Sequence, residues 1–203
     1  MQLNQAGKLI QDKFENYVNK FSNILPKPYF KCLKETMKAM LVESTPNVRK
    51  IAMSMPGDVS LKKKQERITY HLDKDKTFED LNNAFLMCQA KKITSDSVII
   101  IDESDIIKPC AKKMEHLSKV RDGSTGAIEN GYYSFNSTIV NQDNIGGVDI
   151  HPLYSYIYAN DVEPESKNDR LCNFLVDLTI YSENKGILTF DRGYDDRKLI
   201  HQL

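Results

Sequence analysis

The sequence lacks any apolar run long enough to cross a membrane, and its first ten residues are polar, unlike a secretory leader. Its four cysteines are scattered, without a Cys-x-x-Cys pair, and its four histidines show no paired spacing. These absences argue against a disulfide framework and a structural zinc site. We therefore expect a cytoplasmic protein, and 203 residues can form a small helical domain plus one α/β domain.

A strong charge of either sign is also missing, because the formal net charge is zero. The two parts of the chain nevertheless differ. Residues 1–95 carry 17 Lys and Arg against 10 Asp and Glu, whereas residues 96–203 carry 11 against 18. The first part suits a polyanionic partner, and the second concentrates the carboxylates that a divalent-cation site needs. A chance asymmetry of solvated surface charges would give the same counts.

The chain from residue 1 to about residue 92 has the apolar spacing of helices. Within it, residues 45–72 predict two short helices around a turn at Pro56-Gly57. This pattern fits a helix-turn-helix motif that binds DNA, and ordinary packing of helices with a basic surface fits it as well. In the DNA-binding interpretation, the side chains that face phosphates are Lys62, Lys63, Lys64 and Arg67.

The periodicity changes to that of strands from residue 96 onward. The order is strand, strand, strand, helix, strand, helix, which opens a ribonuclease-H-like fold. We therefore predict an α/β domain at residues 95–203, with a mixed, incomplete βββαβα sheet, preceded by an all-helical domain at residues 1–94. The predicted strands are residues 97–102, 131–141, 151–159 and the run before Asp191, and the intervening helix begins after Ser166 and stops by Gly186.

Two aspartates follow strands that lie side by side and parallel in such a fold. Asp102 follows the first strand and Asp191 the fourth, so the two carboxylates would converge. Like charges at this separation are costly unless a cation lies between them, and oxygen ligands without His or Cys favour Mg²⁺ or Mn²⁺. Asp102 and Asp191 are thus candidate metal-binding and catalytic residues, while Arg192 could contact a phosphate or pair with Asp191. Each aspartate taken alone could equally form a turn or cap a helix.

Three segments resemble bacterial insertion-sequence transposases of the DDE type. "VIIIDESDI" (98–106), "RDGSTGAIENGYYSFNSTIVN" (121–141) and "ILTFDRGYDD" (187–196) resemble the family's first-aspartate strand, the hairpin that follows it and its second-aspartate motif. "FSNILPKPYFKCLKETMKAMLVESTPNVRKIA" (21–52) is similar to the helical region that precedes the catalytic domain. The resemblance covers most of the chain.

The resemblance implies DNA transposition: a Mg²⁺ or Mn²⁺ site nicks the element's ends and joins their 3′-hydroxyls to target DNA. The expected partners are terminal inverted repeats, target DNA and a second copy of the chain. Asp102 and Asp191 match the family's first two acids, whereas its third, a glutamate on a later helix, has no match before Leu203. We therefore expect a fragment, or the product of a decayed or frameshifted element, that cleaves little or no DNA alone.

Two other functions fit the same residues. The chain could be a truncated, catalytically inactive DNA-binding protein that represses transposition, in which case Asp102 and Asp191 would be dispensable. It could also be another ribonuclease-H-like nuclease, structure-specific or RNA-cutting, which only the substrate would separate from a transposase.

Overall fold

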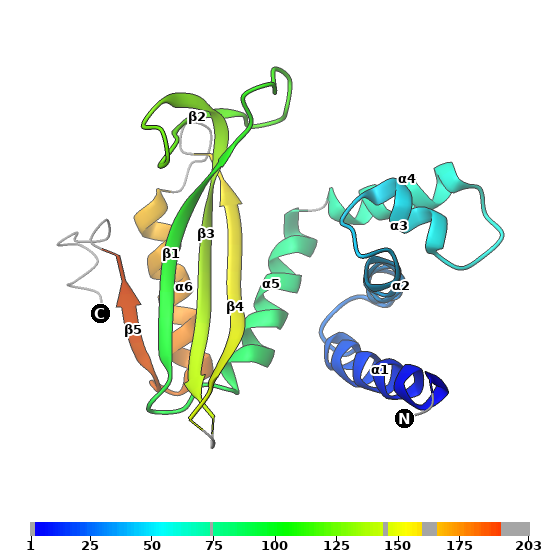
Figure 1. Cartoon of the computed structure of the whole chain (residues 1–203), viewed down its shortest axis with the longest axis horizontal. Helices are drawn as coiled ribbons and strands as arrows, with labels where there is room; N and C mark the ends of the chain where they lie inside the picture. Colours follow the sequence, from blue (N-terminus) through cyan, green and yellow to red (C-terminus); the bar gives the residue numbers. More distant parts are fainter. Residues whose placement is uncertain (1–2, 74, 144–145, 160–165, 192–203) are drawn as a thin grey trace. The chain divides into compact units, whose positions relative to one another are not determined.

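The computed structural model describes residues 3–73, 75–143, 146–159 and 166–191 (Figure 1). The chain divides into two compact units, Met1–Ala84 and Phe85–Leu203. The predicted boundary after residue 94 lies ten residues further along the chain, beyond helix α5 (Asp75–Ala90). The reason is that Leu86 and Ala90 of α5 belong to the hydrophobic core of the second unit.

The first unit is helical, as predicted. Asn47 caps the N-terminus of α3 (Val48–Ser54) through its side-chain oxygen, and Ser60 caps α4 (Leu61–Leu72) in the same way. The two predicted short helices therefore flank Pro56-Gly57. A small core that includes Ile51 and Ile68 holds them together. The helices of the first unit are α1 (Leu3–Val18), the 3₁₀ helix η1 (Asn19–Phe21), α2 (Lys27–Glu43), α3 (Val48–Ser54) and α4 (Leu61–Leu72).

Among the described residues of the whole chain, no helix is both long and apolar enough to span a bilayer.

The second unit is built on a five-stranded mixed sheet. Strand β1 pairs antiparallel with β3 and parallel with β5, while β2 and β4 pair with successive parts of the other edge of β3. The mixed α/β class is therefore confirmed. The strands are β1 (Val98–Ile107), β2 (Ser118–Arg121), β3 (Ile128–Gln142), β4 (Val148–Tyr158) and β5 (Ile187–Phe190).

Two details of the predicted strands were wrong. The first strand does not end at Asp102 but continues to Ile107, because β3 offers a backbone partner to every residue of this extension, down to Gly131. Polar side chains do not end a strand whose backbone groups remain paired. Strand β2 was not predicted, since it has four residues and two of them are Lys119 and Arg121.

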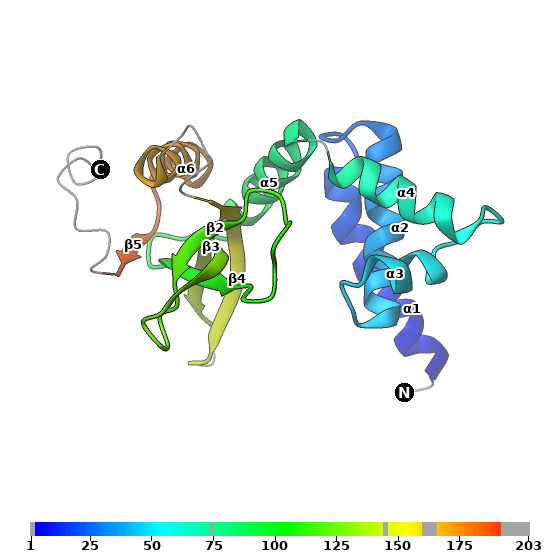
Figure 2. The ribbon, with the colours of Figure 1, turned by 90° about the horizontal axis from the view of Figure 1, so that it is seen from above.

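Helices α5 and α6 (Lys167–Ser182) lie on the same side of the sheet (Figure 2). Ser166 caps α6 as predicted, since its side-chain oxygen accepts a hydrogen bond from the Asp169 N–H. The core between helices and sheet includes Leu86, Ala90, Ile99, Ile101, Phe135, Ile139, Leu153, Leu171, Phe174, Leu175 and Leu178. On the other side, which we call the open face, Ile100, Ile150, Ile157 and Ile187 remain 41 to 62% exposed.

The turn between β2 and β3 is organised by one carboxylate. The Asp122 carboxylate accepts hydrogen bonds from the hydroxyl groups of Ser124, at 2.5 Å, and Thr125, at 2.8 Å, and from the Ser124 N–H at 2.8 Å. These bonds, the Ser124 hydroxyl first, lower the pKa of Asp122 from 3.8 to about 2. All of them favour the ionised form, so the turn is most stable when Asp122 is charged.

We expect the NMR chemical shift of the Asp122 carboxyl carbon to change with pH with a midpoint near pH 2. Because the folded-state pKa is lowered, the stabilisation is complete above the ordinary value of 3.8 and is lost as the pH falls through about 2. Ser124→Ala should return the Asp122 pKa toward its ordinary value. Titration of Asp122 in the parent protein near pH 3.8 would contradict the hydrogen-bonded turn.

Candidate metal centre

The parallel pairing of β1 and β5 brings the two predicted aspartates to neighbouring positions. The last paired residues are Ile101 of β1 and Phe190 of β5. Asp102 and Asp191 come directly after these two residues in the sequence. Neighbouring paired strands lie about 4.8 Å apart. The two aspartates thus follow neighbouring paired positions, one within β1 and one just after the end of β5.

Asp102 belongs to the open face, and Asp191 is exposed just after the end of β5. Ile99 and Ile101 are each 1% exposed and pack into the core under the helices. Ile100 points the other way and is 41% exposed, and Asp102, two residues on, is exposed on that same face. Asp102 therefore lies in the middle of β1, at the point where its parallel neighbour β5 ends.

Two further polar side chains lie at register positions across the sheet from Asp102. Asn136 of β3 is the register partner of Asp102, and Ser155 of β4 is the register partner of Asn136. We call Asp191, Asp102, Asn136 and Ser155 the polar row. Sequence reasoning missed Asn136 and Ser155, because the strand alternation reveals their face but not which residues lie opposite Asp102.

Hydrogen bonds fix the orientation of the Asn136 amide. The Ser155 hydroxyl donates to Asn136 Oδ1 at 2.9 Å. Asn136 Nδ2 donates to Ser134 Oγ at 2.9 Å and lies 3.5 Å from the Ser134 carbonyl oxygen, which can only accept. The amide oxygen keeps a second lone pair for a cation or a bound water. The polar row therefore offers two carboxylates and one oriented amide, all oxygen donors that suit Mg²⁺ or Mn²⁺.

The other acids of the "DESD" segment have different roles. Glu103 points to the helix-covered side and forms an ion pair with Lys167 of α6. Asp105 accepts a hydrogen bond from the Gly123 N–H at 3.3 Å, tying β1 to the β2–β3 turn. Neither joins Asp102, since alternate residues of a strand face opposite sides. Among the described residues, no group of three or more His, Cys, Asp and Glu side chains is placed to hold a metal.

The predicted DNA-binding cations of α4 divide into two kinds. Lys64 donates to the Met55 carbonyl oxygen at 2.6 Å, and Arg67 forms an ion pair with Glu35 of α2. Both therefore contribute to packing within the helical unit. Lys62, whose side chain is 85% exposed and 3.8 Å from Glu66, and the exposed Lys63 are available to an outside partner. The fifth predicted cation, Arg192, lies outside the described residues.

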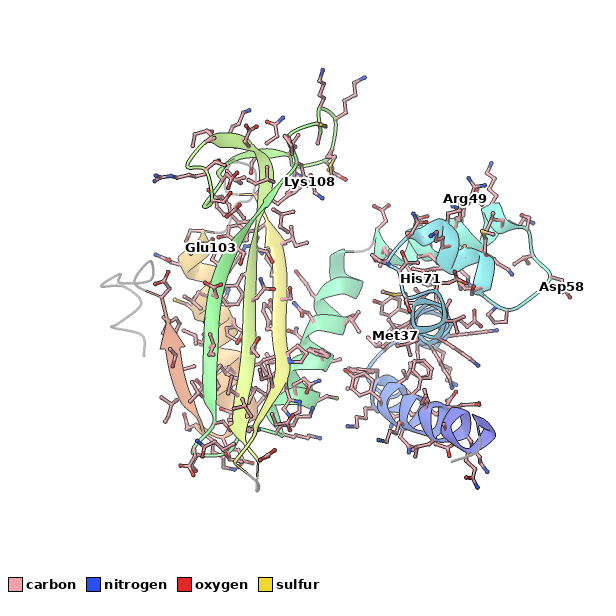
Figure 3. The ribbon with its side chains drawn as sticks, viewed as in Figure 1. Met37, Arg49, Asp58, His71, Glu103 and Lys108 are labelled. Carbon is pink, nitrogen blue, oxygen red and sulfur yellow. The ribbon has the colours of Figure 1, made fainter. Side chains whose placement is uncertain are left out.

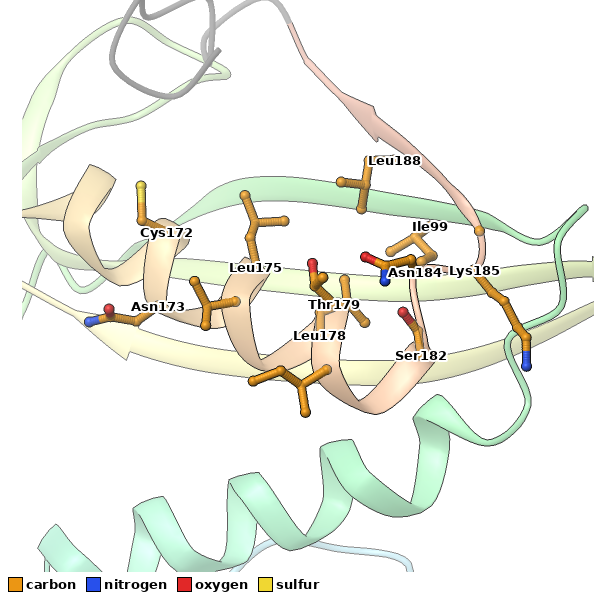
Figure 4. Close-up of a pocket in the computed structure, with 13 residues that line it drawn as sticks. Ile99, Cys172, Asn173, Leu175, Leu178, Thr179, Ser182, Asn184, Lys185 and Leu188 are labelled. Atoms are coloured by element: carbon orange, nitrogen blue, oxygen red, sulfur yellow. The ribbon is translucent and has the colours of Figure 1, made fainter. Parts of the chain in front are cut away.

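A groove of about 660 Å³ lies between α6 and β5 (Figure 4). Its walls are mainly apolar and include Leu175, Val176 and Leu188, while Lys185 supplies one positive charge. Ile99 also lines it, so the groove belongs to the helix-covered side of the sheet and not to the polar row. It has no carboxylate among its lining residues and cannot replace the Asp102 site as a cation site.

The candidate site therefore depends on three features of this chain: the register of β1 and β5, the exposure of Asp102, and the oriented amide of Asn136. No protein-family model matches the sequence, and no curated protein matches it either.

Proposed function

We propose that the chain is the N-terminal part of a DDE-type insertion-sequence transposase, with a ribonuclease-H-like catalytic domain behind a helical DNA-binding region. The observation that supports this proposal is the parallel pairing of β1 and β5, whose last paired residues, Ile101 and Phe190, are followed directly by Asp102 and Asp191. If the two carboxylates approach each other there, a divalent cation between them is favoured. The proposed setting is the cytoplasm, where the DNA of a bacterial element is accessible.

The residues of the polar row have distinct roles in this function. Mg²⁺ or Mn²⁺ bound there would activate a water or a 3′-hydroxyl and stabilise the leaving oxygen of a phosphodiester. Asp102 and Asp191 hold the cation through their carboxylates. Asn136 orients a bound water or phosphate oxygen, because Ser134 and Ser155 fix its amide. The resemblance also implies a glutamate on a later helix as the third acid of the site.

The helical unit would bind the element's ends. Its exposed Lys62 and Lys63 lie on α4, in the part of the chain that carries excess positive charge. Binding through such residues releases counterions from DNA and weakens as salt rises. A repressor that only occupies the ends would share this property, and the metal site separates the two functions.

Iron-directed cleavage tests the metal site without requiring catalysis. Fe²⁺ is taken up by oxygen-ligand sites, and with ascorbate and peroxide it generates radicals that cut nearby backbone. We expect cuts in β1 next to Asp102, in β3 next to Asn136 and at Asp191, and we expect excess Mg²⁺ to suppress them. Fragments can be assigned by mass spectrometry. Uniform cutting, or cuts that Mg²⁺ does not suppress, would remove the support for a metal-dependent enzyme and favour the repressor.

A further inference from the structure

Positive charge gathers at one end of the otherwise acidic second unit. Residues 108–121 contain five Lys and Arg residues and a single acid, Glu115. The remainder of residues 85–203 contains 8 Lys and Arg against 17 Asp and Glu. We call the five cations the basic end: Lys108, Lys112 and Lys113 follow β1, and Lys119 and Arg121 lie in β2.

All five side chains of the basic end are exposed. In β2, Val120 and Ser118 are buried, so the alternation of the strand turns Lys119 and Arg121 to the same outer side. Figure 3 shows Glu103 part-way along β1 and Lys108 beyond it, near the end of the strand. Three of the cations thus follow the end of β1 and two lie in the edge strand β2, beyond the acids of the polar row along β1.

The loop that carries three of these lysines is held in place by hydrogen bonds to β3. The Lys108 N–H donates to the Asn130 carbonyl oxygen at 2.7 Å, and Asn130 Nδ2 donates to the Ala111 carbonyl oxygen at 2.9 Å. Further along, the Tyr132 hydroxyl donates to the Glu115 carbonyl oxygen at 2.6 Å. A loop ordered in this way loses little conformational entropy when it binds a partner.

The sheet sets the distance between Asp102 and the start of the basic end at Lys108. From Asp102 to Ile107, β1 stays paired with β3 over five further residues. At about 3.3 Å per residue, this extension is roughly 17 Å long. That length corresponds to about five base pairs of DNA at 3.4 Å each.

We propose that the basic end contacts the phosphate backbone of double-stranded DNA, starting about five base pairs from the phosphate that the candidate metal centre would hold. The inference rests on the proposed function, which supplies DNA as the partner. Cations on an edge strand can also serve only to prevent edge-to-edge association. That explanation covers Lys119 and Arg121 but not the three lysines of the hydrogen-bonded loop.

The salt dependence of DNA binding tests this contact in the full chain. The variant is Lys112→Gln with Lys113→Gln, and the matched control is Lys91→Gln with Lys92→Gln, an equal charge change at exposed positions after α5. The probe is a fluorescein-labelled DNA duplex, titrated at several salt concentrations. A plot of log K against log salt concentration has a negative slope, and each lost phosphate contact makes it less steep by about 0.9. The magnitude of the slope should therefore fall by up to about two in the loop variant and hardly at all in the control.

The outcomes separate the contact from the proposed function. An equal loss in both variants would show an effect of bulk charge and overturn the contact. An unchanged slope in the loop variant, while the parent protein still binds DNA, would overturn the contact and leave the transposase proposal standing. Failure of the parent protein to bind DNA would overturn both. Tighter binding of a duplex RNA through the same lysines would overturn the assignment to DNA.

Discussion

We expect Asp102→Asn and Asp191→Asn each to weaken Mn²⁺ binding by roughly tenfold or more, which corresponds to a loss of about 1.4 kcal/mol of binding free energy. The reason is that each change removes one of the two carboxylates that would hold the cation in the proposed metal centre, after the last paired residues of β1 and β5. An amide keeps the size of the side chain and one oxygen donor but loses the charge that attracts the cation. Electron paramagnetic resonance of free Mn²⁺ during a titration of the full chain measures the change directly.

Thermal unfolding distinguishes this loss from misfolding. In the proposed centre, Asp102→Asn without metal would relieve the repulsion between the two carboxylates, so its melting temperature should equal or exceed that of the parent protein. With Mn²⁺, the parent protein should gain stability and the variant should not. Asp96→Asn is the matched control, because Asp96 is exposed and lies in the loop before β1. An unchanged Mn²⁺ affinity in both site variants would contradict the metal centre.

Gly131→Ala should have the largest effect on stability. A Cβ at this position would lie 2.4 Å from the Ile106 carbonyl oxygen and 2.7 Å from Val120 Cγ2. Ile106 contributes a backbone atom, so no side-chain rotation relieves the clash, and the strands must move apart. Gly131 pairs with both Ile107 of β1 and Ser118 of β2, so the damage reaches three strands. We expect a loss of about 1–3 kcal/mol or more.

Urea unfolding followed by near-ultraviolet circular dichroism would measure this loss. Because the chain has two units, the transition assigned to the sheet is the relevant one. Gly7→Ala provides the control, since a Cβ at Gly7 meets nothing within 4 Å and the residue lies in helix α1. Alanine there should be neutral or stabilising, by up to about 1 kcal/mol. A Gly131→Ala protein as stable as its parent would refute the close approach of β1, β2 and β3.

Local signals explain which parts of the fold could be predicted from the sequence. The helical spacing of apolar residues and the Ser166 cap act within a few residues of the chain, and the structure confirms both. The end of β1 and the existence of β2 depend instead on partners supplied by β3, which begins at Ile128. A sequence pattern contains no record of such distant pairing.

The same distinction applies to the candidate metal centre. The sequence could predict that Asp102 and Asp191 follow neighbouring strands, because a βββαβα order makes the first and fourth strands neighbours. Asn136 could not be predicted, because its place opposite Asp102 depends on the register of the β1–β3 pairing. Lys64 and Arg67 show the converse limit: their charge is visible in the sequence, but their hydrogen bond and ion pair within the helical unit are not.

The strands that carry the two aspartates are paired to different extents, which has a consequence for the order of folding. Asp102 belongs to β1, whose ten residues all pair with β3. Asp191 lies 89 residues later in the sequence and follows β5, which has only four residue pairs with β1. Closing so long a loop costs entropy, which these four pairs and the partly buried Leu188 and Phe190 must offset. We therefore expect β5 to open while the antiparallel strands remain intact, so that the proposed metal centre would form last and be lost first.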